Sequence, residues 1–409
     1  MKRKSSKFVA LICTLLFLQT NSAIAATKVP ILNTTNSFAI PQASEVVTLS
    51  RLQDKWVIAG IDGNDKSWIA LLDQQGSEIW RSFPLLIGKG GDGFVTAVEV
   101  DSSGILVSGL SQNPIVLPAN QSADVVPTNT PSATPNSTIT SNKNVPLVNP
   151  DNVTPSLSNP LRKDIKNIFL IRINQSGNLE SVWNSTNAKS FIPNSIASVN
   201  NFIFISGNIT SGDNKSQGAL YKFDSSGLID SYIYGENQTT FNKVIAISKK
   251  NLNIVGSSGD TIAQRKVVGK SDGIILTIAP TNGEVVKILR SSAKGGIRSW
   301  DSASGNLLVA GTSQVGSTRE GVVTSFTSKG ALSWTTRFPK SAKTLATGNC
   351  IANGVAGADV LLYLVDTKGK QLKAGRLPKQ NLVALASTPT KGCAVLTAAA
   401  ASGIRMSFL

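Results

Sequence analysis

The feature that most constrains the fold of this chain is a short strand–turn–strand unit that recurs along it. The first copy runs from Ala70 to Trp80 and consists of an apolar strand, a tight polar turn around Gly76 and a second strand that ends in an aromatic residue. The same unit returns around Gly177, Gly227, Gly283, Gly330 and Gly369. Self-similarity at a period of roughly 40 to 50 residues, all in short strands, is typical of a β-propeller.

A second sequence pattern precedes each unit: a few mostly apolar residues followed by a glycine. These glycines are Gly60, Gly109, Gly207, Gly256, Gly311 and Gly354. The last repeat, from Asn381 to Leu409, has room for only three strands. Short strand candidates within residues 26–42 have no hairpin partner nearby and would supply the fourth, leaving no sheet edge unpaired. We therefore predict one all-β domain over residues 26–409, a seven-bladed β-propeller of four-stranded antiparallel blades closed by an N-terminal strand.

The N-terminus has the pattern of a secretory signal peptide. A basic start is followed by an apolar run from Phe8 to Leu18 and by the small residues Ala23 and Ala25. The run is too short for the roughly 20 residues that a membrane span needs. We therefore expect residues 1–25 to be removed by cleavage after Ala25. The mature protein would be secreted or extracytoplasmic, in the cell envelope or periplasm, without a transmembrane anchor.

Blade 2 is longer than its neighbours because of an insertion. Residues 118–163 are rich in Pro, Ser, Thr and Asn and contain almost no aromatic residues, so they cannot bury enough apolar surface to offset the entropy of ordering. We predict a disordered loop between the second and third strands. It is either an insertion that the surface tolerates at little cost or a glycosylated or protease-accessible tether.

Removal of the signal peptide leaves two cysteines, Cys350 and Cys393. An even pair in an oxidising compartment favours a disulfide. Counted from Gly354 and from Thr397, however, the two cysteines occupy matching places in neighbouring blades. We expect their Cα atoms to lie beyond the roughly 7 Å that a bridge tolerates. A disulfide and two buried free thiols therefore both remain open.

The composition excludes several classes of catalytic and metal-binding sites. The chain has no histidine, which excludes Ser–His and Cys–His nucleophile systems and most transition-metal sites. Carboxylates on the expected inner strands are thinly spread: Glu45, Glu99, Asp101 and Asp301. Most other aspartates precede a turn glycine by three residues, where the side chain caps the turn. We assign no catalytic, cofactor-binding or metal-binding residue.

Charge is distributed unevenly along the chain. Residues 285–409 contain 16 Lys and Arg against 4 Asp and Glu, whereas residues 26–284 contain 20 of each class. Several cations fall where one blade passes into the next, namely Lys294, Arg298, Lys340, Lys343, Arg376 and Lys379. These connections share a face with the loops between second and third strands, including the insertion. A basic arc there would attract an anionic polymer, although a merely solvated basic surface explains the charge equally well.

The repeat of an apolar strand, Asp-x-x-Gly, a strand and Trp resembles secreted bacterial seven-bladed propellers of the quinoprotein-like superfamily. The resemblance covers the mature chain through a generic repeat, and it implies the fold. Quinone-dependent dehydrogenases of that superfamily bind their cofactor through further motifs that this chain lacks, so no cofactor and no activity are carried over.

The leading hypothesis is a monomeric, non-catalytic binding or scaffold module. Its partner would be an anionic polysaccharide, a wall polymer, anionic lipid or extracellular DNA. One alternative is a carboxylate-based polysaccharide hydrolase or lyase at the channel mouth, with acids roughly 5 to 10 Å apart. Another alternative is a protein–protein scaffold with an exposed apolar patch.

Overall fold

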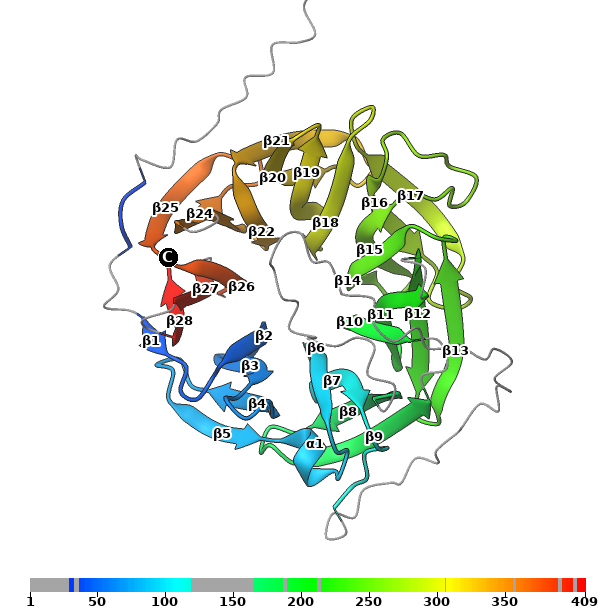
Figure 1. Cartoon of the computed structure of the whole chain (residues 1–409), viewed down its shortest axis with the longest axis vertical. Helices are drawn as coiled ribbons and strands as arrows, with labels where there is room; N and C mark the ends of the chain where they lie inside the picture. The colour runs from blue at the N-terminus through cyan, green and yellow to red at the C-terminus, as the bar shows by residue number, and fades with distance from the viewer. Residues whose placement is uncertain are drawn as a thin grey trace, which may run out of the picture.

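A computed structural model describes residues 29–32, 37–118, 165–186, 190–211, 215–305, 307–355, 358–388, 392–399 and 403–409. Its strands form seven four-stranded antiparallel sheets, set as blades in a ring (Figure 1). The predicted seven-bladed propeller is confirmed, and so is its closure by an N-terminal strand. In the described ranges the only helix is α1 (Pro84–Ile87), which lies between blades 1 and 2.

Blades 1 to 4 are each built from strands that follow one another in the chain. Blade 1 consists of β2 (Glu45–Leu52), β3 (Lys55–Ile61), β4 (Ser67–Leu72) and β5 (Glu78–Ser82). Blade 2 consists of β6 (Gly93–Asp101), β7 (Gly104–Ser111), β8 (Asn167–Ile173) and β9 (Leu179–Thr186). Blade 3 consists of β10 (Phe191–Val199), β11 (Phe202–Ser211), β12 (Lys215–Asp224) and β13 (Gly227–Tyr234). Blade 4 consists of β14 (Thr239–Ser248), β15 (Asn251–Ser258), β16 (Asp272–Ile278) and β17 (Val285–Ser291).

Blades 5 and 6 repeat this order, and blade 7 takes its outermost strand from the N-terminus. Blade 5 consists of β18 (Ile297–Ser304), β19 (Leu308–Val315), β20 (Thr318–Phe326) and β21 (Leu332–Pro339). Blade 6 consists of β22 (Ser341–Thr347), β23 (Cys350–Val355), β24 (Asp359–Val365) and β25 (Gln371–Pro378). Blade 7 consists of β26 (Asn381–Ser387), β27 (Cys393–Ala399), β28 (Gly403–Phe408) and β1 (Phe38–Ala39).

The strand order gives the ring two faces. We call loop face the face with the connections between blades and between second and third strands, such as residues 83–92 and 259–271. The opposite turn face has the short turns between first and second strands and between third and fourth strands, such as residues 53–54 and 73–77. The first strands of all seven blades lie innermost and surround the centre of the ring, which we call the channel (Figure 1).

The glycine at the end of the second sequence pattern is explained by a β-bulge in each first strand. In blade 2 the register shifts between Val95 and Ala97, and Val95 pairs with Gly109. A Cβ atom on Gly109 would lie 1.9 Å from the carbonyl oxygen of Phe94, so only glycine permits this approach. Gly60, Gly207, Gly256 and Gly311 meet a first-strand carbonyl at 1.9 to 2.2 Å in the same way.

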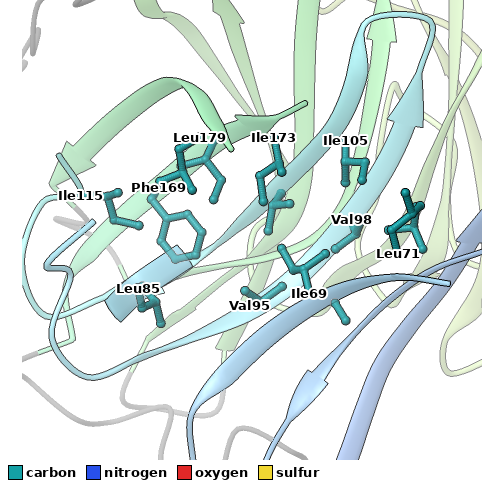
Figure 2. Packing of buried hydrophobic residues seen from close by; sticks show 14 of the residues in the cluster. Ile69, Leu71, Leu85, Val95, Val98, Ile105, Ile115, Phe169, Ile173 and Leu179 are labelled. Atoms are coloured by element: carbon teal, nitrogen blue, oxygen red, sulfur yellow. The ribbon is translucent and has the colours of Figure 1, made fainter. Parts of the chain in front are cut away.

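Apolar side chains are buried mainly between blades. In the described residues seven clusters of buried apolar side chains lie one at each blade interface. Between blades 1 and 2, Ile69 and Leu71 of β4 pack against Val95 of β6 and Phe169 of β8 (Figure 2). Burying each such side chain contributes about 1.5–3 kcal/mol. A single blade has no core of its own, so the ring is the folding unit.

The repeated strand–turn–strand unit forms a contact between neighbouring blades that we call the latch. Trp80, on the fourth strand of blade 1, lies against Gly177, where a Cβ atom would be 2.8 Å from the indole. The indole Nε1 donates a 2.8 Å hydrogen bond to the carbonyl of Gln175 in the same turn. Equivalent latches pair Tyr232 with Gly283, Leu289 with Gly330, Trp334 with Gly369, and Phe38 with Gly76.

The N-terminal segment closes the ring by joining two blades. Phe38 of β1 pairs with Met406 of β28, and its ring centroid lies 5.9 Å from that of Phe408. Residues 29–32 run outside blade 6, where the backbone of Arg376 bonds to Pro30 and Leu32 at 2.9 Å each. The first described residues are therefore tied to the last two blades.

Cys350 and Cys393 form a disulfide with their Cα atoms 5.6 Å apart, which links blades 6 and 7. The expectation that these Cα atoms lie too far apart was wrong, because the two positions are not equivalent. The residue that pairs at the bulge is Val355 in blade 6, not Gly354, and Thr397 in blade 7. Cys350 therefore precedes its bulge partner by one residue more than Cys393 does.

A one-residue shift turns a strand side chain to the opposite face of its sheet. Cys350 consequently points forward from blade 6, and Cys393 points back from blade 7. Both lie in the apolar cluster between these blades, with Leu362 and Leu382. Ile351, the true counterpart of Cys393, lies instead in the cluster between blades 5 and 6.

The predicted signal peptide with cleavage after Ala25 lies outside the described residues. So do all but the first residue of the predicted insertion 118–163, which falls between β7 and β8. In the part of the chain that the structure describes, no helix is long and apolar enough to cross a membrane.

Candidate anion-binding face

Three of the six predicted cations are exposed on the loop face. Lys294 lies between β17 and β18, Lys340 between β21 and β22, and Lys379 between β25 and β26. Lys340 and Lys379 adopt φ values of +57° and +56° at the sharp passage from one blade to the next. The side chains of these three lysines form no ion pair with another described residue.

Arg298 differs from them because its side chain is buried. Its guanidinium group donates a 2.6 Å hydrogen bond to Ser291 Oγ and lies 5.4 Å from the ring centroid of Trp300. Burial, with a smaller contribution from the positive charge of Arg337, lowers the pKa of Arg298 to about 10. This residue contributes to packing between strands and is not presented to a ligand on the surface.

The last two predicted cations are also engaged within the fold. Lys343, on the first strand of blade 6, donates from Nζ to the carbonyl of Val383 at 2.7 Å. Lys343 is nevertheless exposed; partial desolvation by the surrounding protein lowers its pKa, and nearby Asp301 opposes that effect. Arg376 forms an ion pair with Asp359 at 3.1 Å on blade 6. Sequence position placed all six cations near blade connections but could not reveal which way each side chain points.

Three further exposed cations lie on the loop between β15 and β16 of blade 4: Arg265, Lys266 and Lys270. They precede residue 285, where the excess of basic residues begins, and so are not among the six predicted cations. The backbone N–H of Lys270 donates to the carbonyl of Gly296 at 2.7 Å, which fixes this loop against the loop of Lys294. A Cβ atom on Gly269 would lie 2.4 Å from the same carbonyl, so glycine allows the close contact.

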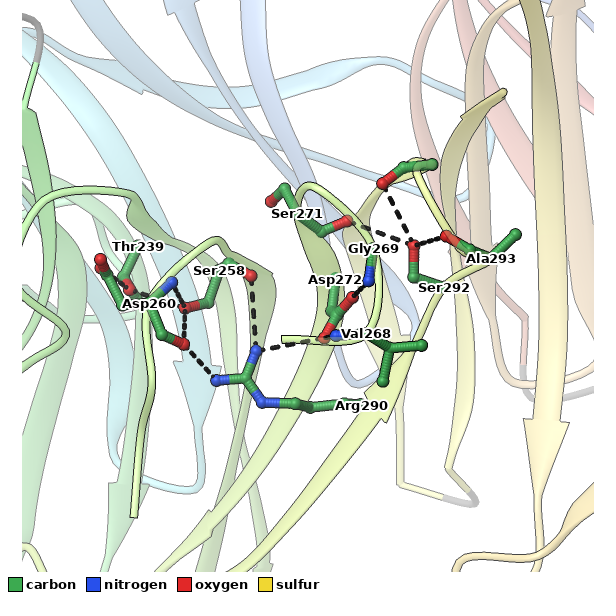
Figure 3. Close-up of polar contacts among 11 residues, drawn as sticks. Thr239, Ser258, Asp260, Val268, Gly269, Ser271, Asp272, Arg290, Ser292 and Ala293 are labelled. Atoms are coloured by element: carbon green, nitrogen blue, oxygen red, sulfur yellow. Dashed lines mark hydrogen bonds and ion pairs between the residues drawn. The ribbon is translucent and has the colours of Figure 1, made fainter. Parts of the chain in front are cut away.

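A buried ion pair fixes the base of the blade 4 loop (Figure 3). Arg290 Nη1 lies 3.2 Å from Asp272 Oδ2, with side-chain exposures of 6% and 0%. Asp272 also accepts the backbone N–H groups of Val268 at 2.9 Å and Gly269 at 2.8 Å. A buried charge pair is tolerated when further hydrogen bonds satisfy both partners, as they do for the Asp272 carboxylate.

Asp260 connects this loop to the passage between blades 3 and 4. Its carboxylate accepts the hydroxyl of Thr239 at 2.7 Å and the backbone N–H groups of Glu236, Asn237 and Gln238. Burial alone would raise the pKa of Asp260, but these four donors hold the pKa below its ordinary value. The carboxylate is therefore a structural acceptor.

We call Arg265, Lys266, Lys270 and Lys294 the loop-face cluster. Both acids of their loops, Asp260 and Asp272, are taken up by backbone and side-chain donors. None of the four cations forms an ion pair within the described ranges. Positive charge also occurs on the turn face, where exposed residues include Lys249, Lys250, Lys329 and Lys368.

The channel carboxylates each have a bonded partner. Glu99 lies 3.6 Å from Lys243, across blades 2 and 4, and Asp101 lies 2.8 Å from Arg172. Burial raises the pKa of Glu99, and Lys243 opposes this effect. Among the residues that the structure describes, no three His, Cys, Asp or Glu side chains are placed to bind a metal ion.

Asp301, the bulged residue of β18, accepts hydrogen bonds from Ser299 Oγ at 3.1 Å and Asn242 Nδ2 at 3.2 Å. Burial raises the pKa of Asp301 to about 6, against the opposing effects of Ser299, Lys343 and Arg319. These bonds join the first strands of blades 4 and 5, so the carboxylate helps to hold the channel wall together.

Comparison with known proteins adds to the description of the fold. No family model matches the chain, and no curated protein matches it. Similar solved structures include the Dos1 propeller, with a TM-score of 0.49 and 8% identity over 93% of this chain and 94% of that one. They also include the quinohemoprotein alcohol dehydrogenase ADHIIG from Pseudomonas putida HK5, with a TM-score of 0.45 and 10% identity over 89% of this chain and 71% of that one.

Proposed function

We propose that this protein is a secreted, non-catalytic binding module that holds an anionic polymer of the cell envelope or its surroundings on the loop face. The observation that carries the proposal is the loop-face cluster. Its four exposed cations lie on two loops that are bonded to each other, and the acids Asp260 and Asp272 of these loops are engaged by other groups. Lys340 and Lys379 continue the positive charge along the same face toward blade 7.

The rigidity of the two loops supports binding over a merely solvated surface. Fixing a flexible loop on association costs free energy that is lost from the affinity. Here the Arg290–Asp272 pair and the Lys270–Gly296 bond fix the loops before any ligand arrives. A polyanion would therefore meet a preorganised set of charges, and its association would weaken as salt screens them.

The test is retention of the protein on immobilised anionic polymers across a salt series. The probes are polygalacturonate, a glycerol-phosphate wall polymer, phosphatidylglycerol vesicles and double-stranded DNA, from about 50 mM to about 500 mM NaCl. The test variant is Arg265→Ser/Lys266→Ser/Lys270→Ser/Lys294→Ser. The matched control, Lys249→Ser/Lys250→Ser/Lys329→Ser/Lys368→Ser, removes the same charge from the turn face.

We expect retention on at least one probe that falls steeply with salt. Retention should be lost in the loop-face variant and kept in the control. Equal loss in both variants would mean that net charge alone is responsible and would overturn the proposal. Retention by neither the native chain nor the control on any probe would overturn it as well.

A further inference from the structure

A pocket of about 830 Å³ opens on the loop face between blades 1 and 2, away from the loop-face cluster. Its walls are the start of β2, the loop between β3 and β4, the connection from β5 through α1 to β6, and the end of β7. Side chains that line it include Asn64, Asp65, Lys66, Phe83, Lys89, Asp92, Phe94 and Gln112. Its volume lies within the range of roughly 300–1,000 Å³ that is usual for small-molecule sites.

Two aromatic rings contribute to the pocket from different sides. Phe83 packs against the core between blades 7 and 1, and Phe94 packs against the core between blades 2 and 3. Both are only partly buried, so part of each side chain remains accessible. Leu85 of α1 belongs to the core directly beneath, beside Ile115 (Figure 2). The pocket therefore combines accessible aromatic surface with a base fixed to the blade 1–2 interface.

Polar groups of every hydrogen-bonding type also face this space. The side chains of Asn64, Asp65 and Lys89 have no bonded partner among the described residues, and Lys66 and Asp92 form a loose ion pair at 3.7 Å. A carboxylate accepts, an ammonium group donates and an amide does both. The lining has three acids, Glu45, Asp65 and Asp92, against two lysines, Lys66 and Lys89, in contrast to the uniformly positive loop-face cluster.

We infer that this pocket binds an uncharged sugar unit, so that the anionic polymer of the proposed function is a polysaccharide. The inference rests on that function and narrows its ligand. A sugar ring has hydroxyl groups around its rim that both donate and accept, and C–H groups on its faces that pack against aromatic rings. The excess of acids over lysines selects against an anionic group at this point, whereas phosphate or carboxylate substituents suit the loop-face cluster. Both sites lie on one face, where a single chain can reach them together.

Two backbone features make the inference testable without damaging the fold. Asp65 and Lys89 have φ values of +60° and +55°, which glycine adopts without strain. Asp65→Gly and Lys89→Gly therefore remove the side chains without changing the backbone conformation of the loops. Gln53→Gly is the matched control, because Gln53 has a φ of +56° and lies exposed on the turn face of blade 1.

The experiment is calorimetric titration of the full chain with neutral linear oligosaccharides of glucose, mannose, galactose, xylose and N-acetylglucosamine. We expect at least one of them to bind, with an affinity that salt leaves unchanged. Asp65→Gly and Lys89→Gly should each weaken that binding by about tenfold, which corresponds to about 1.4 kcal/mol. Gln53→Gly and the loop-face variant should bind as the native chain does.

Failure of every oligosaccharide to bind would overturn the inference, and so would binding that ignores both pocket variants. Either result leaves the proposed function intact if polyanion retention still depends on the loop-face cluster. Retention on DNA or lipid vesicles alone, with no polysaccharide retained, would overturn the sugar assignment and keep the basic face. If the native chain binds a neutral oligosaccharide but is retained on no polyanion, the sugar site stands and the proposed anion-binding function is overturned.

Discussion

The indole nitrogen of Trp80 donates a 2.8 Å hydrogen bond to the carbonyl oxygen of Gln175, which lies 95 residues further along the chain in the next blade. Two residues beyond that carbonyl, Gly177 adopts a φ of +86° beneath the same ring. The aromatic residue and the glycine that mark the repeat in the sequence thus belong to the same contact. In the described residues five such contacts join neighbouring blades, whereas a Cβ atom on Gly227 of blade 3 would meet nothing within 4 Å.

Gly177→Ala should destabilise the ring more than alanine at a left-handed glycine with open space. The new methyl group would lie 2.8 Å from the indole of Trp80. Gly316 has a φ of +59°, and a methyl group added there would meet nothing within 4 Å, so Gly316→Ala measures the backbone cost alone, about 1 kcal/mol. We expect Gly177→Ala to cost about 1–3 kcal/mol beyond that in denaturant unfolding. Equal costs would show that the latch has room to adjust.

Reduction of the disulfide should lower the stability of the native chain. Cys350 and Cys393 are separated by 43 residues, and a bridge over such a loop stabilises by about 2–4 kcal/mol. The measurement is thermal unfolding with and without a thiol reductant. Cys350→Ala/Cys393→Ala should unfold at the lower temperature in both conditions. If reductant fails to lower the midpoint of the native chain, the linkage contributes nothing to stability.

Arg290→Met should cost about 3–5 kcal/mol, because it leaves the Asp272 carboxylate buried without its cation. The change should also free the backbone N–H groups of Val268 and Gly269 for exchange, since Asp272 fixes them. Hydrogen exchange of residues 259–271 is the measurement. Arg337→Met, at the more exposed pair with Glu320, is the control and should cost at most about 1 kcal/mol. Unchanged protection of this loop in Arg290→Met would contradict the anchoring role.

Stability should depend on pH through Asp301. Its pKa is raised to about 6 in the folded chain from an ordinary value of 3.8, so the folded state binds a proton more tightly than the unfolded state does. The contribution of Asp301 is fully present below about pH 4 and is lost as pH rises through about 6. Asp301→Asn keeps an acceptor for Ser299 and Asn242 without the charge.

The free energy of unfolding of Asp301→Asn, relative to the native chain, should therefore increase by about 1–2 kcal/mol between pH 4 and pH 7.5. The expected change is smaller than the full pKa shift would give, because the Asp301 residue is only partly buried and solvent screens part of its charge. Urea unfolding at the two pH values measures it. A difference that does not change with pH would show that Asp301 titrates alike in both states.

The sequence was informative wherever a contact repeats. The turn glycines and the residues at the ends of fourth strands recur because five pairs of neighbouring blades make the same latch in the described residues. The glycines of the second sequence pattern recur because in five blades a carbonyl group of the first strand lies 1.9–2.2 Å from the position that a Cβ atom would occupy. Constraints on the backbone leave a regular spacing of residues in the sequence, so the number of blades and the closure of the ring could be predicted.

Blade 6 shows how that reasoning fails by a single residue. Gly354 looks like the closing glycine, but Val355 holds that place in the register. The glycine pattern alone could not reveal the shift, since alignment on Gly354 assigns the neighbouring residue the wrong face. The consequence was a wrong expectation for the distance between the two cysteines.

Charge shows a different limit. Residue type determined that the second half of the chain is basic, because lysine and arginine keep their charge in almost any fold. Whether a cation is presented to solvent depends on the direction of its side chain and on nearby donors and acceptors. Lys294 and Arg298 are close in sequence, yet one is exposed and the other is buried beside Trp300. The bond between Lys270 and Gly296, which joins two loops of neighbouring blades, is likewise a product of the closed ring.

The sequence by itself determined the repeat, the ring and the net charge, because these follow from local backbone and side-chain chemistry. Only the tertiary structure decided which cations share a surface, because that depends on packing between blades that are distant in the chain.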